Sequence, residues 1–413
     1  MDKPVPAASG YNLAMPKREF IGIAAGLMAL NALAIDVMLP AMQQIGAALG
    51  VDAENDRQFI VTAYILGFGI AQLFFGPISD RFGRRSPLII GLLLYLACAF
   101  GAAFSPTFTI LLALRFLQGV GAAATRVIAL SVVRDTFGGR QMAEVMSLVM
   151  MIFMIIPIIA PSLGQVVMLA FSWHAIFFLM GGIGLAISIW AYLRLPETLK
   201  PENRRAFDPA TILDGFRIVL TNRVALCYTI ATTFVFSALF GFINSAQQIY
   251  VEIYGLGTWF PLLFAAVALL MALSAFLNSR LVGRFGMRRL SHSALLGFLA
   301  VNVVLFAMSL AGPMPLVQFV GILGVAMFLF GWIGPNFNAL AMEPLGHVAG
   351  TASSVLGFTQ TFGGGVLGAM IGQAFDGTVR PITAAYCAVS VIALVLVLIG
   401  ERGRLFRAQN APA

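Results

Sequence analysis

Three charged side chains, Asp36, Arg115 and Arg126, lie within long apolar stretches of the sequence. A carboxylate is costly to bury in such surroundings, so Asp36 predicts a proton-relay or ligand-contact role. The alternative is an aspartate just outside the membrane at the end of its helix. A buried arginine needs a partner, and Arg115 therefore indicates either proton coupling or a structural ion pair. Arg126 follows eleven residues later, about three helical turns, and shares the same helix face. It either lines a cavity as a cation or extends toward water, and the sequence favours neither.

The composition explains why these charges stand out. Of the 413 residues, 60% are hydrophobic and only 10% are charged, whereas soluble domains average about 25% charged. So few charges cannot cover the surface of a soluble protein of this size, and disorder, collagen and coiled coil fail for the same reason. We therefore predict an integral membrane protein. The three cysteines are far apart in apolar runs and predict neither a disulfide framework nor a metal site.

The elements that must position these charges are helices, because a membrane-spanning helix needs about 20 mostly apolar residues. Twelve such runs occur, at 19–42, 58–79, 87–105, 107–130, 143–169, 174–194, 224–249, 259–281, 291–311, 315–339, 349–374 and 381–399.

A mid-chain charged loop divides the helices into two sets of six, and RFGRR at 81–85 is echoed by RFGMRR at 284–289. The sequence thus predicts an all-α protein built from a duplicated six-helix unit. The expected parts are a tail at 1–18, a bundle at 19–194, a linker at 195–223, a bundle at 224–399 and a tail at 400–413.

The net charge of +8 has a topological explanation. With the N-terminus placed in the cytoplasm, 21 of the 25 Lys and Arg residues fall in inner segments, two in outer loops and two inside the fourth helix. This follows the positive-inside rule. We therefore expect both termini in the cytoplasm and no nucleic-acid partner.

Several segments resemble the major facilitator superfamily. GPISDRFGRR at 76–85 is similar to its loop 2–3 signature, and RFLQGVGAAATRV at 115–127 is similar to the helix 4 motif of its proton-driven antiporters. Weaker similarities to twelve-helix drug–proton antiporters, and to their bicyclomycin- and chloramphenicol-resistance subgroup, are found in PIIAPSLG at 157–164, IDVMLPAM at 35–42, WHAIF at 173–177 and LPETL at 195–199.

The resemblance implies two pseudo-symmetric six-helix bundles in a bacterial inner membrane. It implies a monomeric transporter that exports amphipathic, drug-like small molecules in exchange for protons, with Asp36 and Arg115 in proton coupling. The proton gradient would supply the energy, with no cofactor or metal and no enzyme activity. Alternatives are a specific metabolite exporter or importer of the same superfamily and, in another class, a membrane enzyme or sensor. A membrane enzyme would need clustered catalytic side chains, and a sensor would need a sizeable soluble domain. The sequence shows neither feature.

The resemblance also implies a cytoplasmic latch in which Arg84 bridges Asp80 to Asp135. The alternative is a solvated turn whose positive charges only set topology. The second repeat has Gly283 where the first has Asp80, so only the first copy is expected to form the full latch. The latch residues are Gly76, Asp80, Arg81, Gly83, Arg84, Arg85 and Asp135.

Two further groups of residues are expected to matter. Pro157 and Pro161 should kink or stiffen the fifth helix, and Gly164 permits close packing, although simple helix irregularity is the alternative. Polar side chains in the helices are expected to line a substrate cavity, and they are Gln118, Arg126, Asn244, Gln247, Gln248, Asn336, Asn338 and Gln360.

Overall fold

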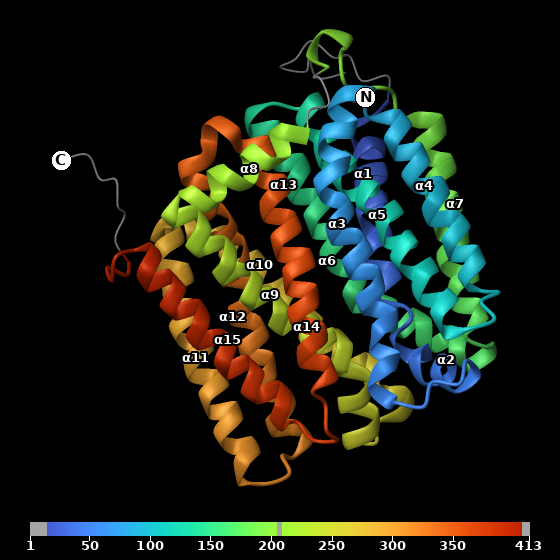
Figure 1. Ribbon diagram of the computed structural model, residues 1–413, viewed down its shortest axis with the longest axis vertical. Helices are drawn as coiled ribbons and strands as arrows, with labels where there is room; N and C mark the ends of the chain where they lie inside the picture. Colours follow the sequence, from blue (N-terminus) through green and yellow to red (C-terminus); the bar gives the residue numbers. More distant parts are fainter. Residues whose placement is uncertain (1–14, 205–208, 407–413) are drawn as a thin grey trace. The chain divides into compact units, whose positions relative to one another are not determined.

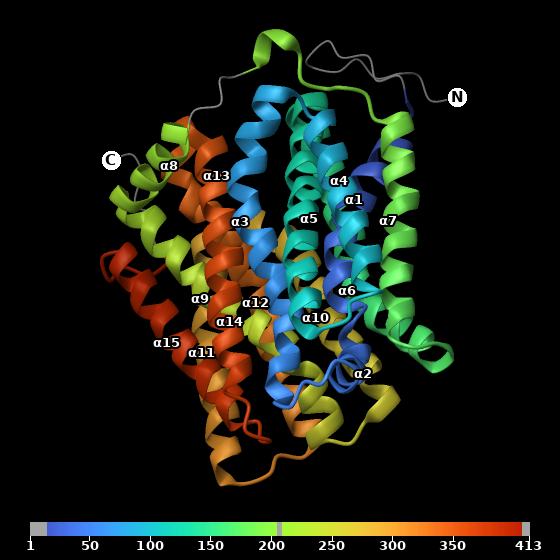
Figure 2. The ribbon, with the colours of Figure 1, turned by 45° about the vertical axis from the view of Figure 1, so that its right-hand side comes forward.

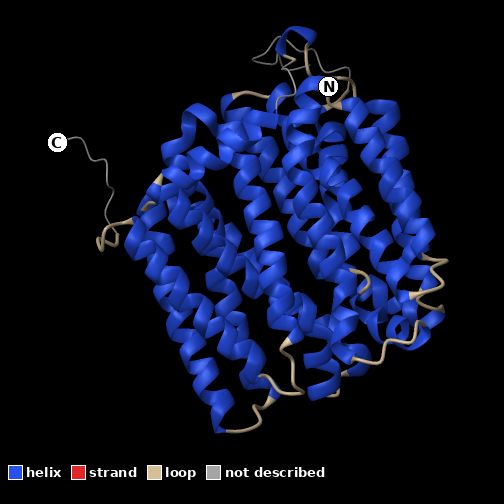
Figure 3. Cartoon of the chain, in the orientation of Figure 1, coloured by secondary structure: helices blue, strands red, loops and turns tan. Residues whose placement is uncertain are grey.

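The computed structural model describes residues 15–204 and 209–406, and within these ranges it contains helices and loops but no strand (Figure 3). In this described part, 12 helical segments are long and apolar enough to cross a membrane. The prediction of an all-α protein with twelve spans is confirmed. The spans are Lys17–Ala48, Glu54–Phe82, Arg85–Ala102, Phe108–Thr136, Glu144–Ala170, His174–Arg194, Arg223–Ile253, Gly257–Phe285, Met287–Ala311, Leu316–Leu345, Ala352–Gln373 and Arg380–Gly400.

The chain divides into two compact units (Figure 1). Unit 1 comprises Met1–Asp52 and Ala63–Pro209, and unit 2 comprises Ala53–Thr62 and Ala210–Ala413. The short segment 53–62 therefore belongs to unit 2, although the sequence places it in the first bundle. Its hydrogen bonds to residues of unit 2, described below, are the reason for this difference.

Unit 1 is built around helices α1 and α5. Helix α1 packs against α5, α6 and α7, while α5 also packs against α4, which in turn contacts α7 (Figure 2). Thr107 is the N-cap of helix α5, and its hydroxyl accepts a hydrogen bond from the Ile110 N–H. The helices of unit 1 are α1 Lys17–Asp36, α2 Met42–Ala48, α3 Phe59–Phe82, α4 Arg85–Ala102, α5 Phe108–Thr136, α6 Gly139–Ala170 and α7 His174–Arg194.

The first span is longer and less regular than the sequence indicates. Helix α1 ends at Asp36, a 3₁₀ turn follows at Leu39–Ala41, and α2 then continues to Ala48. Pro40 lies in the first positions of the 3₁₀ turn, where its missing N–H costs no helical hydrogen bond. Asp36 is consequently the last residue before an interruption within the span, whereas the sequence predicts a helix that simply ends near residue 42.

Unit 2 is built around α9, which packs against α12, α14 and α15. Two of its spans contain π-helical turns, η4 at Gln248–Ile253 and η7 at Thr359–Gly363. Such turns widen the helix locally and are common at functional sites. The helices of unit 2 are α8 Pro209–Thr221, α9 Arg223–Gln247, α10 Phe260–Phe285, α11 Met287–Ala311, α12 Leu316–Met342, α13 Ala349–Phe358, α14 Gly364–Gln373 and α15 Arg380–Gly400.

The linker contains a helix that the sequence analysis does not predict. Helix α8 occupies its second half, inside the range 195–223 that is predicted as a charged loop. Phe216 of α8 meets Phe358 of α13 edge to face, with ring centroids 5.8 Å apart. The apolar face of α8 thus packs on unit 2, and this packing stabilises a helix that is too short to persist alone.

The close packing of α3 on α5 yields a prediction. A Cβ at Gly119 would lie 2.1 Å from the carbonyl oxygen of Tyr64, so Gly119→Ala should force the helices apart. We expect a loss of about 1–3 kcal/mol and a melting temperature lower by a few degrees in a thermal scan in detergent. Gly182→Ala is the control, because a Cβ there meets nothing within 4 Å. Equal melting temperatures for the two variants would contradict the tight α3–α5 contact.

Candidate functional site

Arg115 is at the centre of a buried polar cluster in unit 1. Its side chain is 0% exposed, and its guanidinium donates to Gln118 Oε1 at 2.7 Å and to the Ala34 carbonyl oxygen at 2.8 Å. The guanidinium carbon also lies 4.6 Å from the centroid of the Tyr64 ring, a cation–π contact. Tyr64 in turn donates its hydroxyl hydrogen to Asn31 Oδ1 at 2.9 Å. Helices α1, α3 and α5 are thereby joined around a single positive charge.

Asp36 lies two residues beyond the carbonyl group that Arg115 binds. Its side chain is only 4% exposed, at the last position of α1. A charged carboxylate in this position pays a large desolvation cost, which protonation removes. Arg115 binds the backbone of the helical turn that carries this carboxylate.

Gly164 of α6 supports the same end of α1. A Cβ at Gly164 would lie 2.0 Å from the carbonyl oxygen of Val37, the residue after Asp36. Only glycine permits this approach. Pro157 and Pro161 lie inside α6, which continues from Gly139 to Ala170 without a break. The motif predicted in the fifth helix therefore contacts the backbone beside the buried carboxylate, a neighbour that the sequence does not identify.

Arg126 keeps its dual interpretation. It is partly buried on α5, and its guanidinium carbon lies 5.8 Å from the centroid of the Phe68 ring. This contact places an aromatic face over the cation.

The latch residues lie together at one end of unit 1. Arg84 donates from Nε to Asp135 Oδ2 at 2.7 Å and from Nη1 to Asp80 Oδ1 at 2.5 Å. Burial lowers the pKa of Arg84, but its hydrogen bonds and charge interactions with Asp135 and Asp80 outweigh burial and raise the pKa above its usual value. The bridge expected from the resemblance is thus present in the geometry, while Arg81 is exposed.

A carboxylate that the sequence analysis did not assign to the latch completes it. Glu197 accepts the backbone N–H groups of Arg84 at 2.9 Å and of Arg85 at 3.0 Å. Thr198 donates to Asp135 Oδ2 at 3.1 Å. Gly83 has φ 90°, and a Cβ there would lie 2.5 Å from Glu197 Oε2. The LPETL segment at 195–199 is the sequence signal for this contact. Its acidic residue, Glu197, comes directly after the sixth helix and so lies near the turn that contains Arg84 and Arg85.

The second repeat carries an ion-pair network of its own. Arg288 contacts Glu343 Oε2 at 2.9 Å and Glu401 Oε1 at 2.8 Å, beyond the ends of α12 and α15. Tyr228 of α9 donates to the same oxygen of Glu401 at 2.8 Å. The absence of a carboxylate at position 283 therefore does not leave the repeat without a network, because carboxylates from other helices take its place.

The predicted cavity residues of unit 2 separate into distinct groups. Asn336 of α12 donates to Asn278 Oδ1 of α10 at 2.7 Å, so it ties two neighbouring helices. Asn338 and Gln360 are hydrogen-bonded to each other, and Gln360 lies in the π-helical turn η7. The remaining three, Asn244, Gln247 and Gln248, are buried along α9 and η4.

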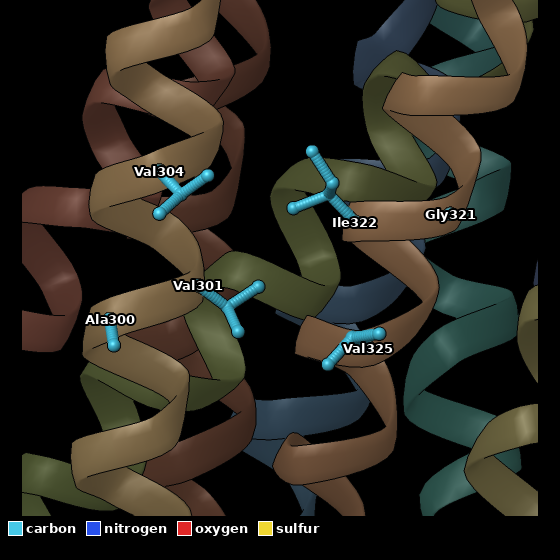
Figure 4. A pocket seen from close by; sticks show the side chains of 6 residues that line it. All are labelled: Ala300, Val301, Val304, Gly321, Ile322 and Val325. Carbon is cyan, nitrogen blue, oxygen red and sulfur yellow. The ribbon is translucent and has the colours of Figure 1, made fainter.

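An apolar groove on unit 2 is not part of this site. It lies between α11 and α12, and Figure 4 shows its side chains. None of the predicted site residues lines it, and it offers no hydrogen-bonding side chain. Its lining residues are Ala300, Val301, Val304, Gly321, Ile322 and Val325.

Twelve apolar helical spans in the described part of the chain, with a buried carboxylate and a buried guanidinium among them, indicate a helical membrane transporter. The sequence model of the Major Facilitator Superfamily matches residues 23–369. The chain is 31% identical over 370 residues to a bicyclomycin resistance protein homolog of Haemophilus influenzae (87% of this chain, 90% of that protein). It is 31% identical over 392 residues to the multidrug resistance protein MdtL of Escherichia coli (94% and 96%).

Solved structures show the same fold. A D-xylose–proton symporter superimposes with a TM-score of 0.75 at 13% identity, covering 95% of this chain and 98% of that one. This chain belongs to the major facilitator superfamily. It is a multi-pass membrane transporter and not an enzyme, as the sequence analysis predicts.

The geometry of the latch yields a prediction. Arg84→Ala leaves Asp135, which is 18% exposed, without its guanidinium partner, and we expect a loss of about 3 kcal/mol. A lower melting temperature and slower transport should follow. Lys200→Ala is the control, because the Lys200–Glu202 pair is exposed and 3.9 Å apart. If the two variants have the same melting temperature and the same transport rate, the Arg84 bridge contributes to neither stability nor transport.

Proposed function

We propose that this transporter exports amphipathic, drug-like molecules in exchange for protons, by alternating access. The observation that carries the proposal is Asp36, a buried carboxylate at the end of α1 beside the Arg115 cluster. Its protonated and charged forms differ strongly in their cost of burial, so proton binding there favours one conformation over another.

Coupling follows from linkage between two ligands of one protein. When a proton on Asp36 and a bound substrate favour opposite states, loading one promotes release of the other. The energy is sufficient without ATP, because one charge that crosses 100 mV is worth about 2.3 kcal/mol. Arg115 acts as a positioning residue, since it binds the backbone of α1 at Ala34 and thereby transmits changes near Asp36 to α5.

The substrate class is supported by relatives and by the site chemistry. The proteins named above are described as resistance proteins for bicyclomycin and for multiple drugs. Three buried side chains along α9 and η4 in unit 2, Asn244, Gln247 and Gln248, are amides, which hydrogen-bond neutral molecules without requiring a charge on the substrate. We propose that the protein works as a monomer surrounded by lipid.

Asp36→Asn should abolish proton-driven export, because an amide cannot release a proton, while the melting temperature stays close to that of the parent. Transport is measured in proteoliposomes with an imposed pH gradient, before and after a protonophore collapses it. The matched control is Asp376→Asn, which makes the same change at an exposed loop carboxylate. Export by Asp36→Asn at the parental rate would remove Asp36 from the mechanism.

The substrate is found first, with a drug-sensitivity panel in an efflux-deficient host. Resistance that persists without the gradient would refute antiport.

We further propose that the protein lies in a bacterial inner membrane with both termini in the cytoplasm. The excess of Lys and Arg in alternate loops supports this orientation. Green fluorescent protein fused after residue 413 should fluoresce, and alkaline phosphatase fused at the same position should be inactive. Active phosphatase at that position would reverse the orientation.

A further inference from the structure

A cluster of neutral amides lies where segment 53–62 meets the rest of unit 2. We call it the amide cluster, and its members are Asn55, Gln58, Gln248 and Gln373. Asn55 donates to the Gln373 carbonyl oxygen at 3.0 Å, and Gln373 Nε2 donates back to the Asn55 carbonyl oxygen at 2.8 Å. Gln248 Nε2 donates to Asn55 Oδ1 at 2.8 Å, and Gln248 Oε1 accepts a hydrogen bond from Gln58 Nε2. The segment is thus attached to η4 and to the end of α14 by hydrogen bonds between uncharged groups.

Gly372 leaves the space that the Gln58 side chain occupies. Gln58 Nε2 donates to the Gly372 carbonyl oxygen at 3.0 Å. A Cβ at Gly372 would lie 2.0 Å from Gln58 Oε1 and 3.1 Å from the Cβ of Asn244. Any larger residue at 372 would therefore prevent Gln58 from docking as it does.

One ion pair accompanies the amides. Arg57 Nη2 lies 3.3 Å from Glu252 Oε1, and the Arg57 side chain is only 10% exposed. Arg57 is one of the two cations that the positive-inside count places in outer loops, and in the structure it lies in the 3₁₀ turn Glu54–Gln58 with its side chain against η4. This ion pair adds one attractive contact to the hydrogen bonds of the amide cluster.

The packed arrangement leaves polar groups unsatisfied beneath the cluster. Asn244 is 1% exposed, and among the residues that the structure describes neither its Nδ2 nor its Oδ1, nor Gln58 Oε1, meets a hydrogen-bonding group of the protein. Such groups lose their hydration without compensation, so entry of water would stabilise them. The hydrogen bonds of the amide cluster can likewise be exchanged for bonds to water at little net cost. A permanent contact would instead bury apolar surface with its polar groups paired.

We propose that the amide cluster is a gate that releases segment 53–62 from the rest of unit 2 during each transport cycle. The residues on both sides of this segment, up to Asp52 and from Ala63 to Pro209, belong to unit 1. Release therefore frees residues 59–62, the start of α3, from the rest of unit 2. The gate rests on the proposed alternating-access function, but its opening has a readout that does not depend on transport.

The first test measures access to position 244. Asn244→Cys is introduced after Cys98, Cys227 and Cys387 are replaced, and it is labelled with a water-soluble maleimide. Adding Gly372→Ala should speed labelling about tenfold, because the new methyl group displaces Gln58 and favours the open gate. The control is Gly321→Ala, a helical glycine at which a Cβ meets nothing within 4 Å. Unchanged labelling with Gly372→Ala would overturn the gate.

A second test guards against general unfolding. Gln58→Cys and Gln248→Cys are joined by a short, reducible bifunctional thiol reagent in the cysteine-replaced protein. The crosslink should stop transport and slow labelling at position 244, and reduction should restore both. Transport at the uncrosslinked rate while the crosslink is intact would refute the gate. If labelling responds as expected but the parent shows no proton-driven export, the gate stands and the proposed function fails.

Discussion

Burying a guanidinium inside an apolar bundle is the constraint around which unit 1 is organised. Arg115 can remain there only if its donors are occupied, and a carbonyl group of α1 and an amide of α5 occupy them. The aromatic face of Tyr64 covers the cation from α3. Three helices must therefore stay in register at one depth, and the close approach at Gly119 is the packing that permits it.

The same constraint fixes the end of α1. The arginine binds the carbonyl group two residues before Asp36, and Gly164 of α6 packs on the carbonyl group one residue after it. The acidic side chain thus projects from a short stretch of backbone that is held on both sides. A change in its charge is therefore imposed on neighbouring helices and cannot be absorbed by a flexible turn.

The sequence indicated much of this design, because membrane helices obey strong rules of length and charge. The twelve spans follow from apolar runs, and Asp36 and Arg115 stand out because few charges occur in such runs. The Arg84 bridge came from resemblance alone, since nothing in its spacing says that Asp135 is near. Glu197, the helix α8 and the amide cluster were missed as structural elements. Their partners lie 112 to 320 positions away, or in the case of α8 depend on tertiary packing, and no local pattern reveals such pairs.

The amide cluster has an electrical consequence. Its hydrogen bonds join neutral groups, and the accompanying Arg57–Glu252 pair has no net charge. Moving the amides within the membrane potential therefore does little electrical work, because that work scales with the net charge displaced. Segment 53–62 itself carries Glu54, Asp56 and Arg57, a formal net charge of −1. The membrane potential therefore acts on this segment through its three charged side chains and not through the amides that hold it.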